Sequence, residues 1–332
     1  ERLLWMASVN KDPKYKEVSD EDNEITNKWF RGFGYLVHTY KNQSFFPGII
    51  FSDYGADDIS RNGRRGKTLI TKGIAEVQKT MGKGGNEFDS SYRHHFADLD
   101  ESVKNYVIDD VPGNFKYNDL YTNISGDISI EHKGKKARTI SFRETPKFVI
   151  TTNWAVRFDE NGASTNSRFI EFKLTDYFNL NNRPEDVFGH KFFEDWDEKE
   201  WNRFYNFFYC CVYLYFEEGL EQIEYDKNSD NYQAYFSNEI KENEFERIFD
   251  IMKQKESFTV SDFLSEYNRF DNPLKNQNLF HQNNMKKLIE VYFKYQNISY
   301  KYRKSERTFY LQNELNEKQN NEMDELLSGI EI

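Results

Sequence analysis

The sequence is poor in the residues that build disulfide frameworks and metal centres. It has 332 residues but only two cysteines, the adjacent Cys210 and Cys211, and six scattered histidines. Neighbouring cysteines rarely close a disulfide, and these residues make no zinc-ligand spacing. We therefore expect a reducing, cytoplasmic environment and no structural metal.

Long apolar runs and targeting signals are also missing. No stretch of 18 apolar residues occurs, which argues against a membrane-spanning helix, and no signal peptide is recognisable. The chain begins at Glu1 rather than Met, so we expect it to be a fragment of a longer protein.

Positive charge is in the minority. The chain has 45 Lys and Arg against 56 Asp and Glu, a formal net charge of −11. This excludes a general nucleic-acid coat but not a local basic channel. Hydrophobic residues make up 37% and aromatic residues 17%, which supplies a large core and excludes wholesale disorder. The length predicts two domains and room for a small third piece.

Hydrophobic periodicity predicts an α/β core. Apolar runs at 48–53, 105–111 and 147–153 are typical of buried strands, and 67–81 has the spacing of a helix. A strand, a glycine-containing loop and a helix form the opening unit of a nucleotide-binding α/β domain. All three strands end in polar residues, and in an open parallel sheet such ends meet at one edge. The alternating stretch 127–142 predicts a hairpin.

Helices are predicted both before and after this core in the sequence. Trp29, Phe30, Phe33, Leu36, Val37 and Tyr40 recur at helical spacing, and 198–217 is a strongly apolar helix that we expect to pack on the core or a neighbouring helix. Helices at 243–254, 260–268 and 279–295, followed by alternating segments at 297–303 and 307–312, indicate a winged helix. We expect the acidic residues 313–332 to be disordered.

A candidate phosphate loop gives the sharpest local signal. It is the segment Gly63-Arg64-Arg65-Gly66-Lys67-Thr68. Glycines let backbone N–H groups approach phosphates, Lys67 would reach the β- and γ-phosphates, and the Thr68 hydroxyl would ligate Mg²⁺. Arg61 occupies the position of the first glycine of the full motif, and a Gly-Lys-Thr triplet is common by chance, so this segment alone leaves the assignment open.

Two further strand ends match this chemistry. Asp109-Asp110 follows an apolar strand, as a Mg²⁺-holding and water-orienting acidic pair would. Asn153 ends the third strand, where an amide could contact the γ-phosphate and the attacking water. Each alone has an ordinary alternative, namely solvated acids or a turn asparagine. Their order along the chain makes the combination stronger than any one signal.

The chain resembles superfamily 3 helicases of the AAA+ class, as found at the C-terminal end of phage, plasmid and poxvirus-type primase-helicases. The resemblance runs from about residue 48 to residue 178. It rests on Gly-Lys-Thr (66–68), Val-Ile-Asp-Asp-Val (107–111), Ile-Ser-Gly-Asp-Ile-Ser-Ile-Glu-His-Lys-Gly-Lys (124–135), Pro-Lys-Phe-Val-Ile-Thr-Thr-Asn-Trp (146–154) and Ser-Arg-Phe-Ile-Glu-Phe (167–172).

The resemblance implies roles by position. Lys67 and Thr68 match Walker A, Asp109 and Asp110 match Walker B, and Asn153 matches the sensor asparagine, with ATP and Mg²⁺ as cofactors. Arg168, or alternatively Arg157, falls where the family carries an arginine finger that reaches the neighbouring subunit, which implies a homo-oligomeric ring, usually a hexamer. A surface salt bridge is the ordinary alternative for Arg168. Two features depart from the family pattern: the loop before Lys67 is longer than usual, and Asp110 replaces the Glu that many relatives use.

The basic hairpin corresponds to the family's DNA-translocating loop. Its cationic residues are His132, Lys133, Lys135, Lys136 and Arg138. In a ring these loops would form a positive collar for single-stranded DNA. An ordinary solvated turn is the alternative.

A second basic cluster interleaved with tyrosines occurs near the C-terminus. Its members are Lys286, Lys287, Lys294, Lys301, Arg303, Lys304 and Arg307. A winged helix would use such residues on DNA, while a protein-docking or structural module is an equal alternative.

The expected layout has five segments. They are a helical lead-in (1–45), the ATPase core (46–180), a helical segment packed on it (181–240), a winged-helix-like domain (241–312) and an acidic tail (313–332). The function hypothesis is an ATP-dependent DNA helicase in replication of a phage or mobile element, acting in the host cytoplasm, with a primase domain or other replication protein as a possible partner. The alternatives are an AAA+ remodelling or initiator ATPase without strand displacement, and a non-enzymatic winged-helix DNA-binding regulator.

Overall fold

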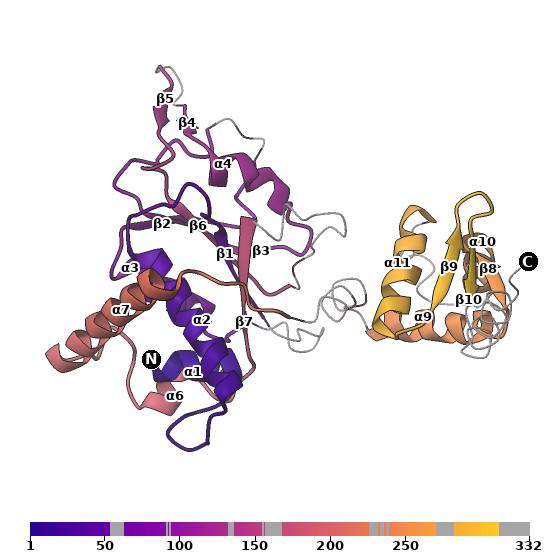
Figure 1. Ribbon diagram of the computed structural model, residues 1–332, viewed down its shortest axis with the longest axis horizontal. Helices are drawn as coiled ribbons and strands as arrows, with labels where there is room; N and C mark the ends of the chain where they lie inside the picture. The colour runs from indigo at the N-terminus through magenta and orange to yellow at the C-terminus, as the bar shows by residue number, and fades with distance from the viewer. Residues whose placement is uncertain are drawn as a thin grey trace, which may run out of the picture. The chain divides into compact units, whose positions relative to one another are not determined.

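A computed structural model divides the chain into two compact units, Glu1–Tyr225 and Asp226–Ile332, which are described separately (Figure 1). The structure describes residues 1–53, 63–90, 92, 94–131, 136–154, 156, 168–225, 232, 236, 239–269 and 282–311. Within these ranges, no helix combines the length and the apolar character needed to span a bilayer.

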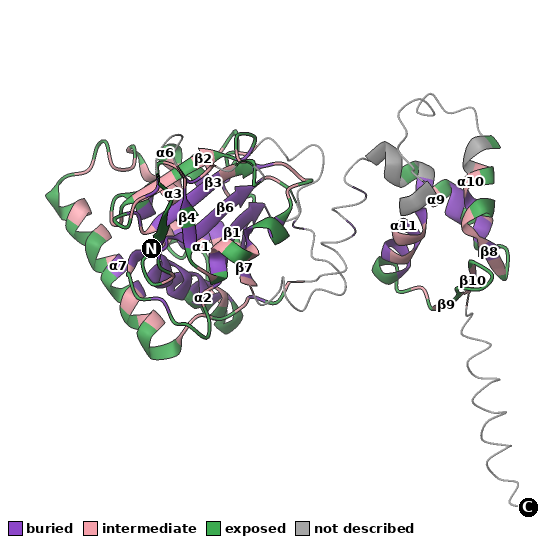
Figure 2. Ribbon diagram, turned by 90° about the horizontal axis from the view of Figure 1, so that it is seen from above, coloured by how far each residue is buried: buried purple, intermediate pink, exposed green. Residues whose placement is uncertain are grey.

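A five-stranded parallel sheet organises the first unit. Its strands, in spatial order, are β2 (Thr80–Gly84), β3 (Asn105–Val111), β6 (Lys147–Thr152), β1 (Gly48–Asp53) and β7 (Phe169–Leu174). Strand β1 places Ile49 between Val149 of β6 and Ile170 of β7. Strands β1, β6 and β7 are buried along their whole length, as continuous apolar runs covered on both faces should be (Figure 2). The unit is a mixed α/β fold of the Rossmann-like or P-loop type.

Helices α1 (Arg2–Val9), α2 (Asp20–Val37) and α3 (Lys67–Ala75) belong to the core on one face of this sheet. Helix α2 begins with a capping box, in which Ser19 and Asp22 satisfy each other's backbone N–H groups. Trp29 on this helix is fully buried, with its ring centroid 5.9 Å from Phe51 and 5.1 Å from Phe172. Aromatic packing therefore fixes α2 on the sheet.

The long helix α7 (Glu198–Glu218) packs across α2. At Gly34 of α2 the helices approach so closely that an added Cβ would lie 2.0 Å from the Cys211 carbonyl oxygen. Phe33 and Phe208 meet across the same contact with ring centroids 6.0 Å apart. Both Cys210 and Cys211 are free thiols. The expectation that the 198–217 helix packs against a neighbouring helix is therefore confirmed.

The opposite face of the sheet is covered by the chain between β2 and β6. It includes η1 (Tyr117–Leu120), α4 (Tyr121–Ser125) and the antiparallel pair β4 (Ile128–Ile130) and β5 (Arg138–Ile140). The predicted hairpin at 127–142 is thus present in its two strands, and it projects from the sheet (Figure 1).

Of two buried lysines, Lys147 closes the carboxyl end of α2 and Lys41 binds the segment that precedes β6. The Lys147 ammonium donates to the carbonyl oxygens of Tyr35 and His38, the latter at 2.7 Å. The Lys41 ammonium donates to Thr145 Oγ1 at 2.6 Å. These cations satisfy and complement carbonyls at a helix end and the adjoining loop. Burial lowers the pKa of Lys41 to about 7 and that of Lys147 well below its usual range.

The second unit combines helices with a small antiparallel sheet. Its elements are α9 (Glu239–Met252), β8 (Ser257–Thr259), α10 (Val260–Arg269), α11 (Gln282–Tyr295), β9 (Tyr300–Arg303) and β10 (Thr308–Leu311), with strand order β8-β10-β9. An aromatic core that includes Phe258, Phe293 and Phe309 joins the helices to the sheet.

Three sequence expectations were wrong in detail. The helix expected at 67–81 ends at Ala75, and Thr80–Gly84 forms strand β2 instead. This strand has two glycines and no apolar alternation, so its parallel pairing with β3 rather than local propensity decides its conformation. Tyr40 lies beyond the end of α2 and its side chain is 58% exposed. Strands β7 and β8 were not anticipated.

Candidate functional site

The candidate phosphate loop runs directly into helix α3. Gly63, Arg64 and Gly66 have positive φ angles of 66°, 66° and 103°, and Gly66 is the N-cap residue of a nine-residue helix that begins at Lys67. The glycines adopt these left-handed conformations without steric cost. An added Cβ at Gly63 would lie 3.5 Å from Asn153 Oδ1, so the loop passes beside the end of β6.

The acidic pair lies on an irregular strand end. The pairing of β3 with β6 shifts register between Ile108 and Val111, and Asp110 has a φ of 55°. Thr151 holds both acids in place, because its Oγ1 donates to Asp109 Oδ1 at 2.6 Å and accepts from the Asp110 N–H at 2.8 Å. The bulge turns two consecutive carboxylates toward the same region instead of opposite faces of the sheet.

Asn153 connects the third strand to this acidic pair. Its Nδ2 donates to Asp110 Oδ1 at 2.8 Å, while its Oδ1 is buried and has no hydrogen-bond partner among the described atoms. An unsatisfied buried acceptor is costly, and a ligand or water with an O–H or N–H group would satisfy it. The bond to Asp110 therefore fixes the orientation of the Asn153 amide, and its Oδ1 is placed to accept a hydrogen bond from a ligand.

Lys67 is held by a carboxylate that the sequence analysis placed only at a strand end. Its ammonium donates to Asp53 Oδ1, and the residues are 8% and 3% exposed. Burial lowers the pKa of Lys67 below its usual range, and the Asp53 charge opposes that shift. The second oxygen, Asp53 Oδ2, is buried without a partner among the described atoms. Asp53 and Lys67 are 14 positions apart in the sequence, and no motif spacing links them, so sequence patterns did not reveal the pair.

Lys67, the acidic pair, Asn153 and the glycine-bearing loop line one cleft of about 680 Å³ at the carboxyl ends of β3 and β6. It is lined by Gly63, Arg64, Gly66, Lys67, Thr68, Leu69, Asp109, Asp110, Thr151, Asn153, Arg183, Pro184 and Glu185. Thr68 is exposed and Asp109 is half-buried, so a hydroxyl and a carboxylate oxygen face the space where a hard cation such as Mg²⁺ would be held. The donor set therefore fits a metal–phosphate ligand.

Arg65 is positioned differently from its neighbours. It is 4% exposed, and its guanidinium donates to the Leu174 carbonyl oxygen at 3.2 Å, at the end of β7. Its side chain thus anchors the loop to the sheet, while its backbone belongs to the predicted phosphate loop. The assignment of Arg65 to cofactor binding stays a prediction.

Arg168 does not join this cleft. It precedes β7, whose first residue Phe169 pairs with Gly48, the first residue of β1. The cleft lies at the opposite ends of these strands, roughly 20 Å away for six residues at about 3.3 Å each. The guanidinium lies 4.9 Å from the centre of the Tyr121 ring and donates to the Tyr121 carbonyl at 3.4 Å. Arg168 therefore does not line the cleft of its own chain. Arg157 lies outside the described residues.

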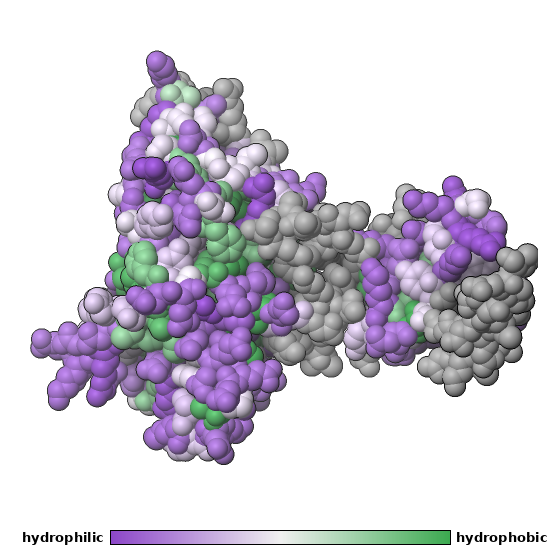
Figure 3. All heavy atoms as spheres, in the orientation of Figure 1, coloured by the Kyte–Doolittle hydropathy of each residue, from purple (hydrophilic) through white to green (hydrophobic). Residues whose placement is uncertain are grey.

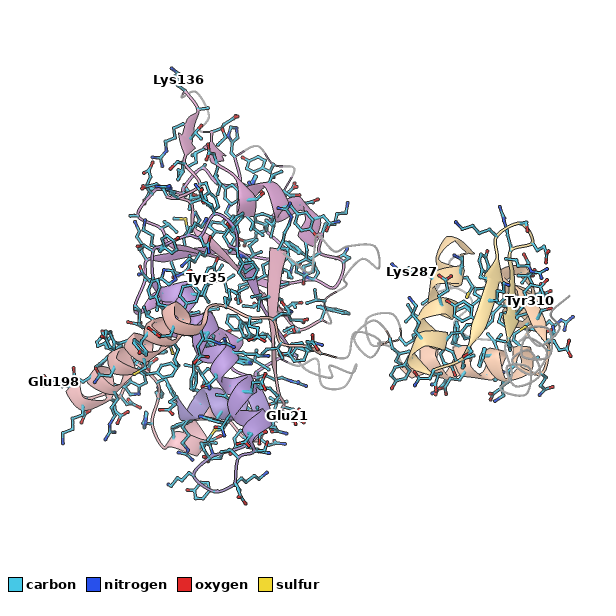
Figure 4. The ribbon with its side chains drawn as sticks, in the orientation of Figure 1. Glu21, Tyr35, Lys136, Glu198, Lys287 and Tyr310 are labelled. Atoms are coloured by element: carbon cyan, nitrogen blue, oxygen red, sulfur yellow. The ribbon has the colours of Figure 1, made fainter. Side chains whose placement is uncertain are left out.

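Of the basic hairpin, the structure describes residues 127–131 and 136–142. Lys136 is exposed at its outer end (Figure 4), whereas His132, Lys133 and Lys135 lie outside the described residues. Arg138 at the start of β5 donates to Glu101 at 3.3 Å and to the Leu99 carbonyl at 2.6 Å. A DNA phosphate would have to compete with Glu101 for this guanidinium.

A larger hollow of about 840 Å³ lies between α1, α7 and the chain before α7. Its lining is dominated by aromatic side chains such as Phe193, Trp196 and Phe204, and hydrophobic surface gathers where α7 passes α3 (Figure 3). Glu1, Arg2, His190, Glu200 and Arg203 also line it, but no phosphate-type loop or acidic pair is among its described lining residues, so we assign the chemistry to the smaller cleft.

Residues 282–311 of the second unit are strongly basic. They contain seven Lys and Arg against two Glu, a net charge of +5 in a chain whose net charge is −11. Lys286, Lys287 and Lys294 share the solvent side of α11 with Glu290, and the Lys286 ammonium lies 4.4 Å from the centre of the Tyr302 ring on β9. The basic side of the helix therefore continues onto the hairpin.

Comparison with protein-family models gives no match, and comparison with curated proteins gives none. Among solved structures, the chain is similar to two A-form apo structures of the C-terminal region of NrS-1, with TM-scores of 0.41 and 0.37 and sequence identities of 14% and 13%. In both, the similarity covers 84% of this chain and 64% of the other, so this chain spans less than two thirds of those structures. At this level of similarity, any functional conclusion rests on the chain's own residues.

Proposed function

We propose that this chain is an ATP hydrolase of the superfamily 3 type that moves single-stranded DNA. One observation carries the proposal: Lys67, the acids at 109–110 and Asn153 come from separate elements and line a single cleft beside a glycine-bearing loop. The family resemblance suggests the reaction, and the grouping of these residues at one cleft supports it.

Each of the cleft residues would have its own role in phosphoryl transfer. When bound, Mg²⁺–ATP supplies the phosphoanhydride bond and a metal ion that neutralises charge on its phosphates. Lys67 would exchange Asp53 for the phosphates, and Thr68 with Asp109 would hold the metal. Asp110 orients the attacking water, while Asn153 fixes Asp110 through Nδ2 and accepts from the water through Oδ1.

The ring is the second part of the proposal. A cation from another protomer would complete each site, and Arg168 suits this role because it lies at the sheet edge away from its own cleft. Lys133, Lys135 and Lys136 on the hairpins would then face the DNA in the centre, where each neutralised phosphate releases counterions. We place this activity in the replication of a phage or mobile element, as the resemblance implies.

The second unit favours a DNA-contacting role within the same protein. Its helices and antiparallel sheet follow the order expected for a winged helix, and the net charge of +5 in residues 282–311 fits a polyanion. A protein lacking ATPase activity but retaining this binding would be a DNA-binding regulator, which is the principal non-enzymatic alternative.

Replacement of Lys67 tests the proposal. We expect Lys67→Ala to abolish DNA-stimulated phosphate release, whereas Lys72→Ala, an exposed lysine on the same helix outside the cleft, should leave it intact. Unchanged phosphate release in Lys67→Ala would refute the ATPase assignment.

Forked DNA then separates the helicase from a remodelling ATPase. A helicase displaces the complementary strand in an ATP-dependent manner. Phosphate release without displacement would favour the remodelling or initiator ATPase.

A further inference from the structure

A segment that the sequence motifs do not include also enters the cleft. Arg183, Pro184 and Glu185 form the start of α6 (Pro184–Phe188) and line the same space as Gly63 and Lys67. The chain reaches this point from the end of β7 through a turn closed by reciprocal backbone hydrogen bonds between Asn179 and Asn182. Arg183 thus approaches the cleft from an element independent of the phosphate loop.

The backbone of Arg183 is fixed, but its charged group is weakly engaged. Its N–H donates to Asp186 Oδ2 at 3.3 Å, and Pro184 restricts the next φ angle. The guanidinium lies 3.9 Å from Glu185, with both side chains about half exposed, and has no other ion-pair partner among the described residues. Such a pair contributes little to stability, so the guanidinium can exchange Glu185 for a ligand at small cost.

The cleft needs further positive charge. A triphosphate carries about four negative charges, and Mg²⁺ offsets only part of them. The Lys67 ammonium is paired with Asp53, and the Arg65 guanidinium is directed to the β7 carbonyl. Arg64 and Arg183 are the remaining cations among the described lining residues.

We propose that Arg183 contacts the phosphate chain of a nucleotide bound in its own protomer, and that Glu185 holds the guanidinium when phosphate is absent. This inference rests on the proposed nucleotide site and adds a residue to it. Arginine suits the role because its planar group donates two parallel hydrogen bonds to phosphate oxygens. Arg183 acts within one chain, which distinguishes it from Arg168.

The test measures the affinities of a non-hydrolysable ATP analogue and of AMP for the full chain. We expect Arg183→Ala to weaken analogue binding at least tenfold while AMP binding changes much less, since most of the contacted charge is absent from AMP. Arg183→Lys should recover part of the loss, and Glu185→Gln should bind the analogue as tightly as wild type or more tightly. Arg203→Ala is the matched control, because this exposed arginine pairs with Glu200 outside the cleft.

The possible outcomes distinguish this inference from the proposed function. If the wild-type chain binds no nucleotide, the nucleotide site itself is refuted. If the wild type binds the analogue and Arg183→Ala binds it equally well, only the role of Arg183 is refuted. An equal loss of analogue and AMP binding would refute a contact with the β- and γ-phosphates and assign Arg183 to the part of the nucleotide that AMP shares. Melting temperatures of Arg183→Ala and Arg183→Lys close to that of the wild type would show that both variants are folded.

Discussion

Lys67 and Asp53 form a buried ion pair whose partners have different surroundings. The ammonium faces the cleft, whereas the carboxylate is enclosed at the end of β1. A buried pair is costly to break because the remaining charge is left without a partner. A phosphate that attracts Lys67 must therefore compensate for the carboxylate that Lys67 leaves behind, so under the proposed function Asp53 would oppose nucleotide binding.

Replacing Asp53 tests this coupling. We expect Asp53→Asn to lower the free energy of unfolding by about 3 kcal/mol, because a buried ammonium loses its counter-charge. An ATP analogue should raise the melting temperature of this variant more than that of wild type, since phosphate then supplies the missing charge. Thermal denaturation with and without the analogue measures both effects, and the exposed Asp98→Asn serves as control. Equal shifts in the two proteins would contradict the coupling.

Lys41 gives a prediction for the pH dependence of stability. Its pKa in the folded protein is lowered by burial to about 7, while the unfolded chain keeps a value of about 10.4. Between these values the unfolded state binds a proton that the folded state does not, so the unfolding free energy rises with pH. Lys41→Met should make this rise shallower between pH 7 and 10, with the remaining slope due in part to Lys147.

Urea denaturation at pH 7, 8.5 and 10 would measure the slope for Lys41. The exposed Lys199→Met should retain the wild-type profile. Parallel profiles for wild type and Lys41→Met would show that Lys41 keeps its proton when the protein folds.

At the scale of elements, the contact between α2 and α7 depends on a missing side chain. Alanine is favoured over glycine in a helix by about 1 kcal/mol, but at Gly34 the added carbon would overlap the Cys211 carbonyl. We therefore expect Gly34→Ala to destabilise the protein by about 2 kcal/mol through helix displacement.

Gly73 on α3 is the matched control for this contact. Its added Cβ would lie 3.5 Å from Phe193, an ordinary contact distance. Gly73→Ala should be neutral or stabilising in the same thermal denaturation assay. Similar melting temperatures for the two variants would show that the helices adjust at no cost.

The hairpin carries the element-scale prediction for DNA. Lys133→Ala combined with Lys135→Ala should weaken single-stranded DNA binding and reduce the salt dependence of log K by about 1.4, since each phosphate contact contributes about 0.7. Nucleotide binding should persist. Fluorescence anisotropy over a salt series measures the slope, and Lys191→Ala with Lys199→Ala, two exposed lysines near the start of α7, is the control. An unaltered slope would contradict a contact between the hairpin lysines and DNA phosphates.

The elements that sequence patterns revealed are those with strong local signals. Strands β1 and β3 are continuous apolar runs, so their bounds were predictable to the residue. Strand β2 was not, because Gly82 and Gly84 give no strand signal and only pairing with β3 defines it. In the site, the motif residues were found by their order along the chain. The Lys67–Asp53 pair and the approach of Arg183 were not, because tertiary structure alone creates them.

At the scale of the whole molecule, the separation of Arg168 from its own cleft gives a prediction about assembly. Arg168→Ala alone should bind ATP but lose turnover, and Lys67→Ala should also be inactive. A mixture of these two variants should regain phosphate release, because some interfaces combine an intact Lys67 with an intact Arg168. Each variant mixed with itself is the control. Failure of the mixture to recover activity would contradict a shared site or the assembly of mixed rings.

Strand β7 connects Arg168 at one end with the phosphate loop at the other. Arg168 stands immediately before it, and the carbonyl of its last residue, Leu174, accepts the hydrogen bond from Arg65 of the loop. All six residues of β7 pair with β1, and an extended strand held in this way is stiff along its axis, so its two ends shift together. In the proposed ring, a displacement of the phosphate loop in one protomer would therefore also move Arg168 of that protomer. Because Arg168 would serve the neighbouring site, successive sites would be linked mechanically without an additional hinge.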